Sequence, residues 1–308
     1  FRIFVALRLP DSFPKKPASV TDTPGNSMSL RTGKEVLALP LSPALYRHDG
    51  YTHHPCNPAQ RLTLLRGMVR DAAEGHGRQT FLAGWLNGSD ELVGVLIAGR
   101  FPLGEECFGL GMAHVHCFLV DPDFRSASKA AKGLYSAFTD WAVQLGIVHS
   151  ACRTGSDNWV VINLFESLGL EPIDHVVLHL VRPEHLRRFP RLKTFHEIRA
   201  YRCEDREQII GHCTGGFTTS RFVTDPDLPE EGKKQFFRSW AERICDGIMS
   251  DRIWVAVDRQ DAVVGFMGWK TQSNWLRHLD IKVAGEGLGA VLPTGTGAGF
   301  VWRHGMAI

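Results

Sequence analysis

The sequence lacks the cysteine patterns that cross-link or metallate a fold. Its 308 residues include 7 cysteines, an odd number, with no CxxC pair and no spacing typical of a zinc site. Several lie inside apolar runs, as Cys117 does between Val115 and Phe118. We therefore expect buried thiols in a reducing cytoplasm, without a disulfide framework or a metal site.

The sequence also lacks a long apolar run and an excess of charge of either sign. No run approaches the roughly 20 apolar residues of a membrane-spanning helix. The 35 basic and 33 acidic residues give a formal net charge of +2, which provides no electrostatic footprint for nucleic acid or an anionic membrane. No loop reads GxGxxG or GxxxxGK[ST], which argues against Rossmann and P-loop nucleotide binding. The composition is typical of a soluble globular protein of about two domains.

The distribution of prolines and polar residues suggests how the chain is divided. Residues 1–33 combine a few apolar residues with a proline-rich polar stretch, and Met28 would make a plausible start, so this segment is predicted to be disordered or non-native. A first domain is expected over residues 34–183, a proline-containing linker over 184–195 and a second domain over 196–308. Similar element orders in the two halves suggest a weak internal repeat of about 150 residues.

Hydrophobic periodicity predicts a mixed α/β fold for the first domain. Helices are expected where apolar residues recur with the helical period, and strands where β-branched and apolar residues alternate or run together. A glycine-containing polar turn is expected over residues 102–111. The predicted elements are helices over 59–75, 128–145 and 157–168, and strands over 80–86, 91–98, 113–120, 147–152 and 175–181.

The segment Val120–Ala130 combines a buried strand, a loop of small residues and the start of a helix. Backbone N–H groups at a helix N-terminus are unpaired and carry partial positive charge. Small side chains let a diphosphate approach these groups closely. The segment therefore predicts an anion site, and the chemistry of the chain is expected to centre on it.

This segment resembles motif A of the GNAT (GCN5-related N-acetyltransferase) superfamily. Val120 and Pro122 match its Val-x-Pro start, Arg125 fills its basic position and Ala130 its last small position, while Ser128 stands where glycine is usual. Downstream, two asparagines and a Leu-Phe-Glu-Ser-Leu-Gly-Leu run over 164–170 are similar to the family's Asn-containing helix. The resemblance covers roughly residues 36–181.

The resemblance implies a GNAT fold, with a mixed sheet whose two central strands splay apart to hold acetyl-CoA. A backbone N–H near Leu119 would polarise the thioester carbonyl. An amine would then attack directly within a ternary complex. The residues that the resemblance assigns to the cofactor are Leu119, Val120, Arg125, Ser126, Ala127, Ser128, Lys129, Ala130, Asn158, Asn163 and Phe165.

Histidines on the strand before the loop are candidates for the base that deprotonates the amine. Strand alternation predicts that His114, His116, Phe118 and Val120 share one face. A histidine there would titrate near neutral pH. The alternative is that both histidines line a pocket or pack in the core.

Two further points of chemistry stay open on the sequence. Glu105 and Glu106, in the preceding turn, are alternative bases, or else residues of a solvated turn. The family's usual acid, a tyrosine that protonates the leaving thiolate, is replaced by Phe165, which has no proton to donate. Another group supplies the proton, the thiolate leaves unassisted, or catalysis is lost.

A second loop, Val291–Gly299, resembles the same motif with Thr294 at the basic position. Residues 196–308 are therefore interpreted as a partial second GNAT-like domain of a tandem arrangement, and we expect the sequence to be incomplete after it. The predicted function is acetyl transfer to the amine of a small molecule such as an amino sugar or aminoglycoside. The alternative is an inactive acyl-CoA-binding or interaction module. A homodimer is possible for either.

Overall fold

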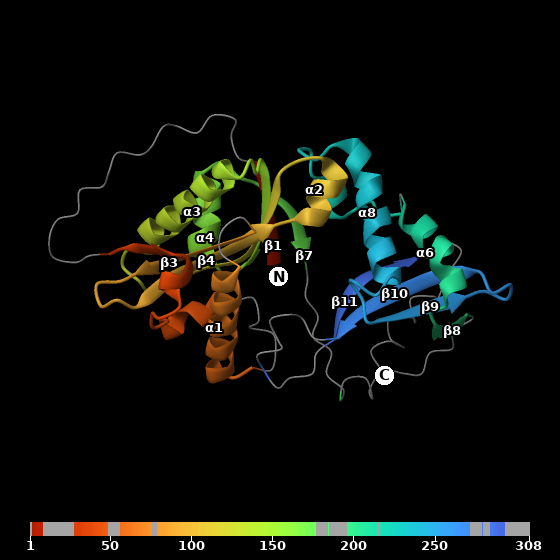
Figure 1. Ribbon diagram of the computed structural model, residues 1–308, viewed down its shortest axis with the longest axis horizontal. Helices are drawn as coiled ribbons and strands as arrows, with labels where there is room; N and C mark the ends of the chain where they lie inside the picture. Colours follow the sequence, from red (N-terminus) through yellow and green to blue (C-terminus); the bar gives the residue numbers. More distant parts are fainter. Residues whose placement is uncertain are drawn as a thin grey trace. The chain divides into compact units, whose positions relative to one another are not determined.

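The computed structural model describes residues 2–8, 28–48, 56–75, 79–176, 184, 196–214, 216–271, 279 and 284–292. The chain divides into two compact units, Phe1–Leu178 and His179–Ile308. Of the predicted linker over 184–195, only Glu184 is among the described residues. Each unit is a layered α/β structure, and each is described separately below (Figure 1).

The first unit is built on a seven-stranded mixed sheet in the order β2-β3-β4-β5-β6-β1-β7. All neighbouring strands are antiparallel except β5 and β6, which run parallel. This arrangement confirms the predicted mixed α/β class. The strands are β1 (Arg2–Arg8), β2 (Leu30–Thr32), β3 (Thr80–Leu86), β4 (Leu92–Arg100), β5 (Met112–Val120), β6 (His149–Gly155) and β7 (Pro172–Val176).

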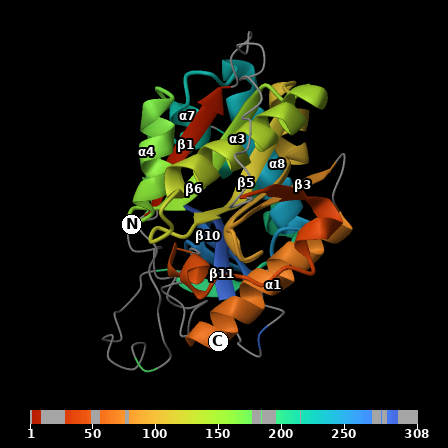
Figure 2. The same ribbon diagram turned by 90° about the vertical axis from the view of Figure 1, so that its left-hand side faces the viewer.

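Helices cover both faces of this sheet. Figure 2 shows α3 (Ala127–Gln144) and α4 (Trp159–Ser167) on one side and α1 (Pro58–Glu74) on the other. Two short segments are 3-10 turns, η1 (Gly33–Val36) and η2 (Pro43–His48). The three long helices α1, α3 and α4 occupy the predicted segments, with ends shifted by one or two residues.

The sequence fixes the start of α1 and the end of α3 locally. The Asn57 side chain accepts a bond from the backbone N–H of Gln60, and the Gln60 side chain accepts one from the backbone N–H of Asn57, which forms a capping box ahead of Pro58. At the C-terminal end of α3, Gly146 has φ +66°, a left-handed conformation that residues other than glycine adopt poorly. Tertiary burial then holds the helices on the sheet.

The core beneath α3 joins aromatic rings from four elements. Phe81 on β3 packs against Phe138 and Trp141 on α3, with ring centroids 5.9 and 5.6 Å apart. Phe165 on α4 packs edge-on against Phe118 on β5, at 6.0 Å. Aromatic pairs in these geometries add to the stabilisation that comes from burial alone. This core fixes α3 and α4 over the two central strands.

The structure differs from the sequence-based expectation at the N-terminus. Arg2–Arg8 forms β1, which pairs antiparallel with β6 on one side and β7 on the other. The segment was expected to be disordered because its apolar run is short. Its partners lie about 150 residues away in the chain, and such non-local pairing leaves no signal in the local pattern. The polar stretch over 9–27 lies outside the described residues.

The turn predicted over residues 102–111 contains a short helix, α2 (Pro102–Phe108). Pro102 stands at its first position, where a missing N–H costs nothing. Gly109 ends it in the left-handed conformation with φ +67°. The prediction of a turn was wrong. The glycines and glutamates of this segment favour a polar turn, but Pro102 and Gly109 are also typical of the start and the end of a helix.

The second unit repeats four consecutive strands of the first, β2 to β5. Its antiparallel sheet has the order β11-β10-β9-β8, matching β5-β4-β3-β2 in chain order and in space. Its strands are β8 (Glu197–Ala200), β9 (Arg252–Val257), β10 (Val263–Thr271) and β11 (Ala284–Val291). Its helical elements are η3 (Cys203–Asp205), α6 (Arg206–Cys213), α7 (Arg221–Thr224) and α8 (Glu230–Cys245). The glycine loop predicted after β11 lies outside the described residues.

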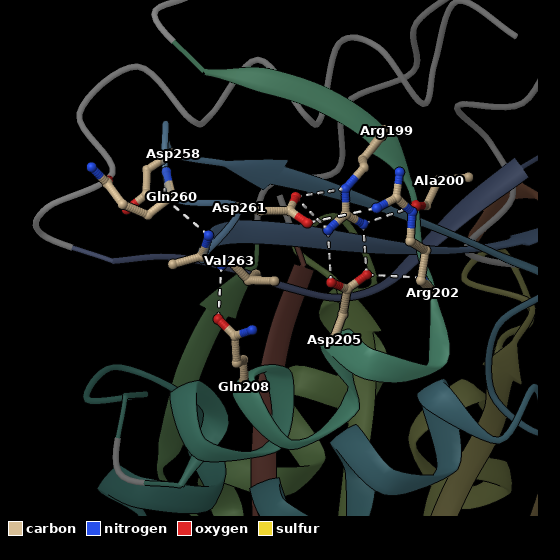
Figure 3. A network of polar contacts seen from close by, with 10 residues as sticks. Arg199, Ala200, Arg202, Asp205, Gln208, Asp258, Gln260, Asp261 and Val263 are labelled. Atoms are coloured by element: carbon tan, nitrogen blue, oxygen red, sulfur yellow. Dashed lines mark hydrogen bonds and ion pairs between the residues drawn. The ribbon is translucent and has the colours of Figure 1, made fainter.

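An ion-pair network ties β8 to the β9–β10 turn in this unit (Figure 3). The guanidinium of Arg199 donates to both oxygens of Asp205, at 2.7 and 2.9 Å, and also to Asp261 at 3.0 Å. Asp205 is buried. Hydrogen bonds from Arg199 and the Arg202 backbone, opposed by burial, leave the pKa of Asp205 below its usual range. The network is structural: both oxygens of Asp205 accept hydrogen bonds from Arg199, and Asp261 joins it from the exposed turn.

Aromatic and cysteine side chains can be located in this architecture. Phe236 and Phe237 are buried on α8, with ring centroids 5.5 Å apart. Four of the seven cysteines are buried, Cys203 is exposed, and no disulfide forms. Within the described residues, no helix is long and apolar enough to cross a membrane, and no cluster of side chains is suited to hold a metal ion.

Close packing of α3 on β3 makes a testable stability prediction. A Cβ added at Gly133 would overlap the ring of Trp85. We expect Gly133→Ala to destabilise the first unit by about 1–3 kcal/mol through overpacking, measured as a lower midpoint of urea unfolding. Lys132→Ala, at the adjacent exposed position of α3, should change stability by less than about 0.5 kcal/mol. Equal effects of the two substitutions would contradict the prediction.

Candidate active site

The central feature of the first unit is an opening between its two parallel strands. β5 and β6 pair only from Met112↔His149 to Val115↔Cys152, although β5 continues to Val120 and β6 to Gly155. Beyond that point the strands part, and α3 and α4 cover the same face (Figure 2). The resemblance predicts this splay, and the strand register confirms it.

Asn158 bridges the opening at the N-terminus of α4. Its amide nitrogen donates to the backbone oxygen of Phe118 on β5, at 3.1 Å, and to the hydroxyl of Thr154 on β6, at 3.0 Å. The residue is only 1% exposed. Its amide oxygen is buried and accepts no hydrogen bond. A buried acceptor without a donor is costly, so the opening contains a position that favours an N–H group.

The backbone of β5 presents a further polar edge to this opening. Because the N–H and C=O of one strand residue point to the same side, the N–H of Phe118 faces the opening together with its carbonyl oxygen. The peptide groups of Leu119 instead face Val95 on β4. The donor expected near Leu119 is therefore provided by Phe118, one residue earlier.

The loop after β5 is held by a buried carboxylate. Asp121 accepts a hydrogen bond from the hydroxyl of Ser42, at 2.9 Å, and another from the backbone N–H of Asp123, at 2.9 Å. These bonds shape the turn that leads into α3. Pro122 and the exposed Arg125 lie within this turn. Sequence reasoning included Asp121 in the motif but assigned it no role.

The N-terminus of α3 points its first N–H groups away from the helix body. The N–H of Ala127 is used by the Phe124 carbonyl oxygen, and the N–H of Ala130 by the Ser126 carbonyl oxygen. Ser128 and Lys129 stand between them, and both are exposed. No intrahelical acceptor is available to N–H groups in the first turn. This end of α3 is suited to an anion.

A β-bulge in β5 separates the histidines from the core residues. Ile97 pairs with Cys117 and Ala98 with Val115, so that His116 is an extra residue opposite β4. Phe118 and Val120 consequently join Val115 in the core beneath α3. The prediction that they share a face with the histidines was wrong, because the bulge shifts the alternation by one residue.

The two histidines lie together, as the sequence predicts. The rings of His114 and His116 have centroids 5.3 Å apart, and Phe101 lies edge-on to His114 at 6.1 Å. A Cβ on Gly99 would come within 3.2 Å of His116 Nε2, so glycine makes room for the ring on β4. The side chain of His116 keeps an exposed face.

Desolvation sets the protonation of His116. Although part of the residue is exposed, protein atoms surround the ring closely enough to lower the pKa of its imidazole below the usual value. The ring is therefore neutral at neutral pH, which is the form that accepts a proton. His116 therefore places a neutral imidazole at the bulge of β5.

The two glutamates of α2 differ in their surroundings. Glu105 pairs with Arg100, with 2.6 Å between Nη2 and Oε1, and accepts the backbone N–H of Met112 at 3.1 Å. These contacts make it an anchor between α2 and the strands. Glu106 is exposed on α2.

The residues assigned to α4 are not equivalent either. Asn158 is buried in the opening, whereas Asn163 is exposed on the helix. Phe165 is buried and touches Phe118 and Tyr135, both with ring centroids 6.0 Å away. Sequence reasoning missed Thr154 and Tyr135, since neither belongs to a motif and only the fold brings them to the opening.

Comparison with known proteins identifies the fold. No protein-family model and no curated protein matches the chain. A solved structure of the glucosamine N-acetyltransferase region in a fungal multi-domain GH3 β-N-acetylglucosaminidase matches 95% of this chain, with TM-score 0.51 and 9% identity. The matched part is 35% of that protein, so this chain spans about a third of its length. The chain has the fold of the GCN5-related N-acetyltransferases.

Two other solved structures are similar at lower scores. A GCN5-related N-acetyltransferase from Sphaerobacter thermophilus matches 90% of this chain and 79% of its own, with TM-score 0.47 and 12% identity. The aminoglycoside 6'-N-acetyltransferase AAC(6')-Ih from Acinetobacter baumannii matches 51% of this chain and 99% of its own, with TM-score 0.34 and 18% identity.

The bridge across the opening makes a second stability prediction. Asn158→Ala removes the donor to the Phe118 oxygen, and this buried acceptor is then unsatisfied. We expect a loss of about 1–3 kcal/mol in the free energy of unfolding, measured by urea denaturation. Asn163→Ala, on the exposed side of the same helix, is the matched control and should cost less than about 0.5 kcal/mol. Full stability of Asn158→Ala would refute the structural role of the bridge.

Proposed function

We propose that the first unit binds acetyl-CoA in the opening between β5 and β6 and transfers its acetyl group to the amine of a small molecule. The observation that carries this proposal is the buried, unpartnered amide oxygen of Asn158 beside the outward N–H of Phe118. Together they offer an acceptor for an amide N–H and a donor for a carbonyl oxygen to an acyl-CoA lying between the strands. The pantetheine arm of CoA carries amide N–H groups, and the thioester carries the carbonyl oxygen.

The remaining parts of the cofactor have counterparts at the mouth of the opening. The N–H groups of Ser128 and Lys129 at the start of α3 are suited to the pyrophosphate, with Arg125 adding positive charge. The N–H of Phe118 would donate to the thioester carbonyl oxygen and stabilise the negative charge that develops there. The chemistry proposed is direct attack of the amine nitrogen on the thioester carbon.

His116 is the base that this arrangement favours. The neutral imidazole at the bulge of β5 would take the proton that the amine loses as the carbon–nitrogen bond forms. His114 and Phe101 line the same surface beside it. His114 and Glu106 are the other candidates carried from the sequence, and Glu106 would require the acceptor to reach the outer side of α2.

A second function is favoured by Phe165, which stands where the family's usual acid is found. Without that hydroxyl, the domain would hold acyl-CoA without transferring the acyl group. The amine acceptor in the first case, and the partner in the second, are not specified by a motif of this chain. Amino sugars and aminoglycosides are the acceptors to examine first, with a homodimer as a possible assembly.

The direct test is acetyl-CoA turnover by the full chain with a panel of amino sugars, aminoglycosides and polyamines. We expect free CoA to form in proportion to an acetylated amine, both measured by chromatography with mass detection. Chromatography is preferred to thiol reagents because Cys203 is exposed. Tight CoA binding without turnover would favour the inactive module, and absence of binding would overturn both functions.

The proposed pyrophosphate site predicts a charge effect that is separate from stability. Ser128 is the second residue of α3, where an acidic side chain stabilises a helix through its dipole. We therefore expect Ser128→Asp to keep or raise the unfolding midpoint while weakening CoA binding at least about 10-fold, or about 1.4 kcal/mol, by calorimetric titration. Ser128→Asn is the neutral control and should bind CoA nearly as the parent does. Unchanged affinity in Ser128→Asp would argue against this site.

The proposed base predicts the pH dependence of the reaction. Only neutral His116 accepts a proton, so kcat/KM should fall as the pH drops through the pKa of this group. Because desolvation lowers that pKa, the midpoint should lie below the ordinary value of about 6.5. His116→Gln should remove this limb and reduce kcat/KM by about 10²-fold or more, whereas His114→Gln should retain the limb. A limb that persists in His116→Gln would assign the base elsewhere.

A further inference from the structure

Tyr135 on α3 lies above the point where the central strands part. Its ring stands edge-on to Phe165, with centroids 6.0 Å apart and planes at 73°. Phe165 in turn contacts Phe118, the residue whose peptide group faces the opening. Tyr135 therefore lies beside the position that the resemblance reserves for an acid, on the neighbouring helix.

The ring contacts tie Tyr135 to the opening through Phe165 and Phe118. Cys152 on β6 is near enough to add to the raised pKa of Tyr135, and it belongs to the last β5–β6 pair, opposite Val115. Tyr135 therefore lies on the side of the opening where the paired region ends, and an acyl-CoA inserted from the wide end would bring its sulfur toward this side. Tyr135 is half-buried, so the side chain also has an accessible edge.

We propose that the Tyr135 hydroxyl donates a hydrogen bond to the thioester sulfur as CoA leaves, in the place of the tyrosine that Phe165 replaces. This role rests on the proposed acetyl transfer. It provides a hydroxyl near the leaving thiolate, which Phe165 cannot provide. A hydrogen-bond donor at the leaving atom acts in the transition state, where negative charge on sulfur develops.

The pKa of Tyr135 decides whether its hydroxyl shares its proton with the sulfur or transfers the proton completely. Burial, with a smaller contribution from Cys152, raises the pKa of Tyr135 to about 12. An ordinary thiol has a pKa of about 8.5, so the thiolate is the weaker base and the proton stays on oxygen. Cys152 itself is fully buried with a pKa raised to about 12, so it stays neutral and does not oppose charge on sulfur.

Acetyl transfer forms one bond at the thioester carbon and breaks another. The amine nitrogen forms a bond to the thioester carbon, and its proton passes to His116 and on to water. The carbon–sulfur bond breaks with its electron pair on sulfur, stabilised by the Tyr135 hydroxyl. The thiolate takes a proton from water on release. The products are the acetylated amine and CoA, and both side chains return to their starting states.

The experiment compares Tyr135→Phe and the double variant Tyr135→Phe/Phe165→Tyr with the parent chain. Tyr135→Phe should lower kcat by about 10²-fold, with the KM for acetyl-CoA changed by less than about 3-fold. The double variant, which moves the hydroxyl to position 165, should recover most of the loss.

A leaving-group comparison separates chemistry from packing. When acetyl-CoA is replaced by its oxygen-ester analogue, the leaving group is a stronger base and needs the donor more. The loss caused by Tyr135→Phe should then grow by at least about 10-fold, whereas a purely structural defect would leave the ratio unchanged. CoA affinity and the circular dichroism spectrum serve as checks that each variant is folded.

The outcomes distinguish the proposed role of Tyr135 from the proposed acetyl transfer on which it rests. Turnover by the parent with no loss in Tyr135→Phe would overturn the role of Tyr135 and leave acetyl transfer standing. The role of Tyr135 would also be overturned if the loss in Tyr135→Phe is neither recovered in the double variant nor enlarged with the oxygen ester. The loss would then be an effect of packing. Absence of turnover by the parent with every amine would overturn both proposals.

Discussion

The candidate site depends on one interrupted strand pairing. A parallel pair that ends while both strands continue leaves peptide groups inside the protein without their ladder partners, and each such group is costly unless another donor or acceptor replaces the ladder. Asn158 supplies a donor to the Phe118 oxygen and a link to Thr154, so the strands can part without losing that bond. The N-terminus of α4 must therefore lie at the opening, and the turn between β6 and α4 is correspondingly short. The opening is a compensated feature of the fold.

The β-bulge at His116 provides the other half of the arrangement. Without it, regular alternation along β5 would place either the histidines or Phe118 on the wrong face. With it, Ala113 and Val115 before the bulge and Phe118 after it all face α3. One inserted residue thus lets a single strand supply both a core and a polar surface on opposite sides. The loss of one ladder pair with β4 is the cost of this division.

The sequence predicts the elements that carry their own local signals. The strand–loop–helix at Val120–Ala130 and the glycine that ends α3 require no knowledge of distant residues. It fails where partners are remote, as for β1, whose neighbours lie near the other end of the unit. It also fails at the bulge, because a phase shift appears only when β5 is aligned on β4. In the site, the same distinction separates Asn158, which belongs to a pattern, from Tyr135 and Thr154, which do not.

The second unit clarifies why the chemistry is assigned to the first. Its strands repeat the order of β2 to β5, which makes β11 the counterpart of β5. In the first unit, the opening exists because β5 has antiparallel β4 on one side and parallel β6 on the other. Among the described residues of the second unit, β11 pairs with β10 alone. A groove between strands requires two walls, and the described part of the second unit provides one of them. The bridging asparagine, the bulge histidine and the ring contacts of Tyr135 all belong to the first unit.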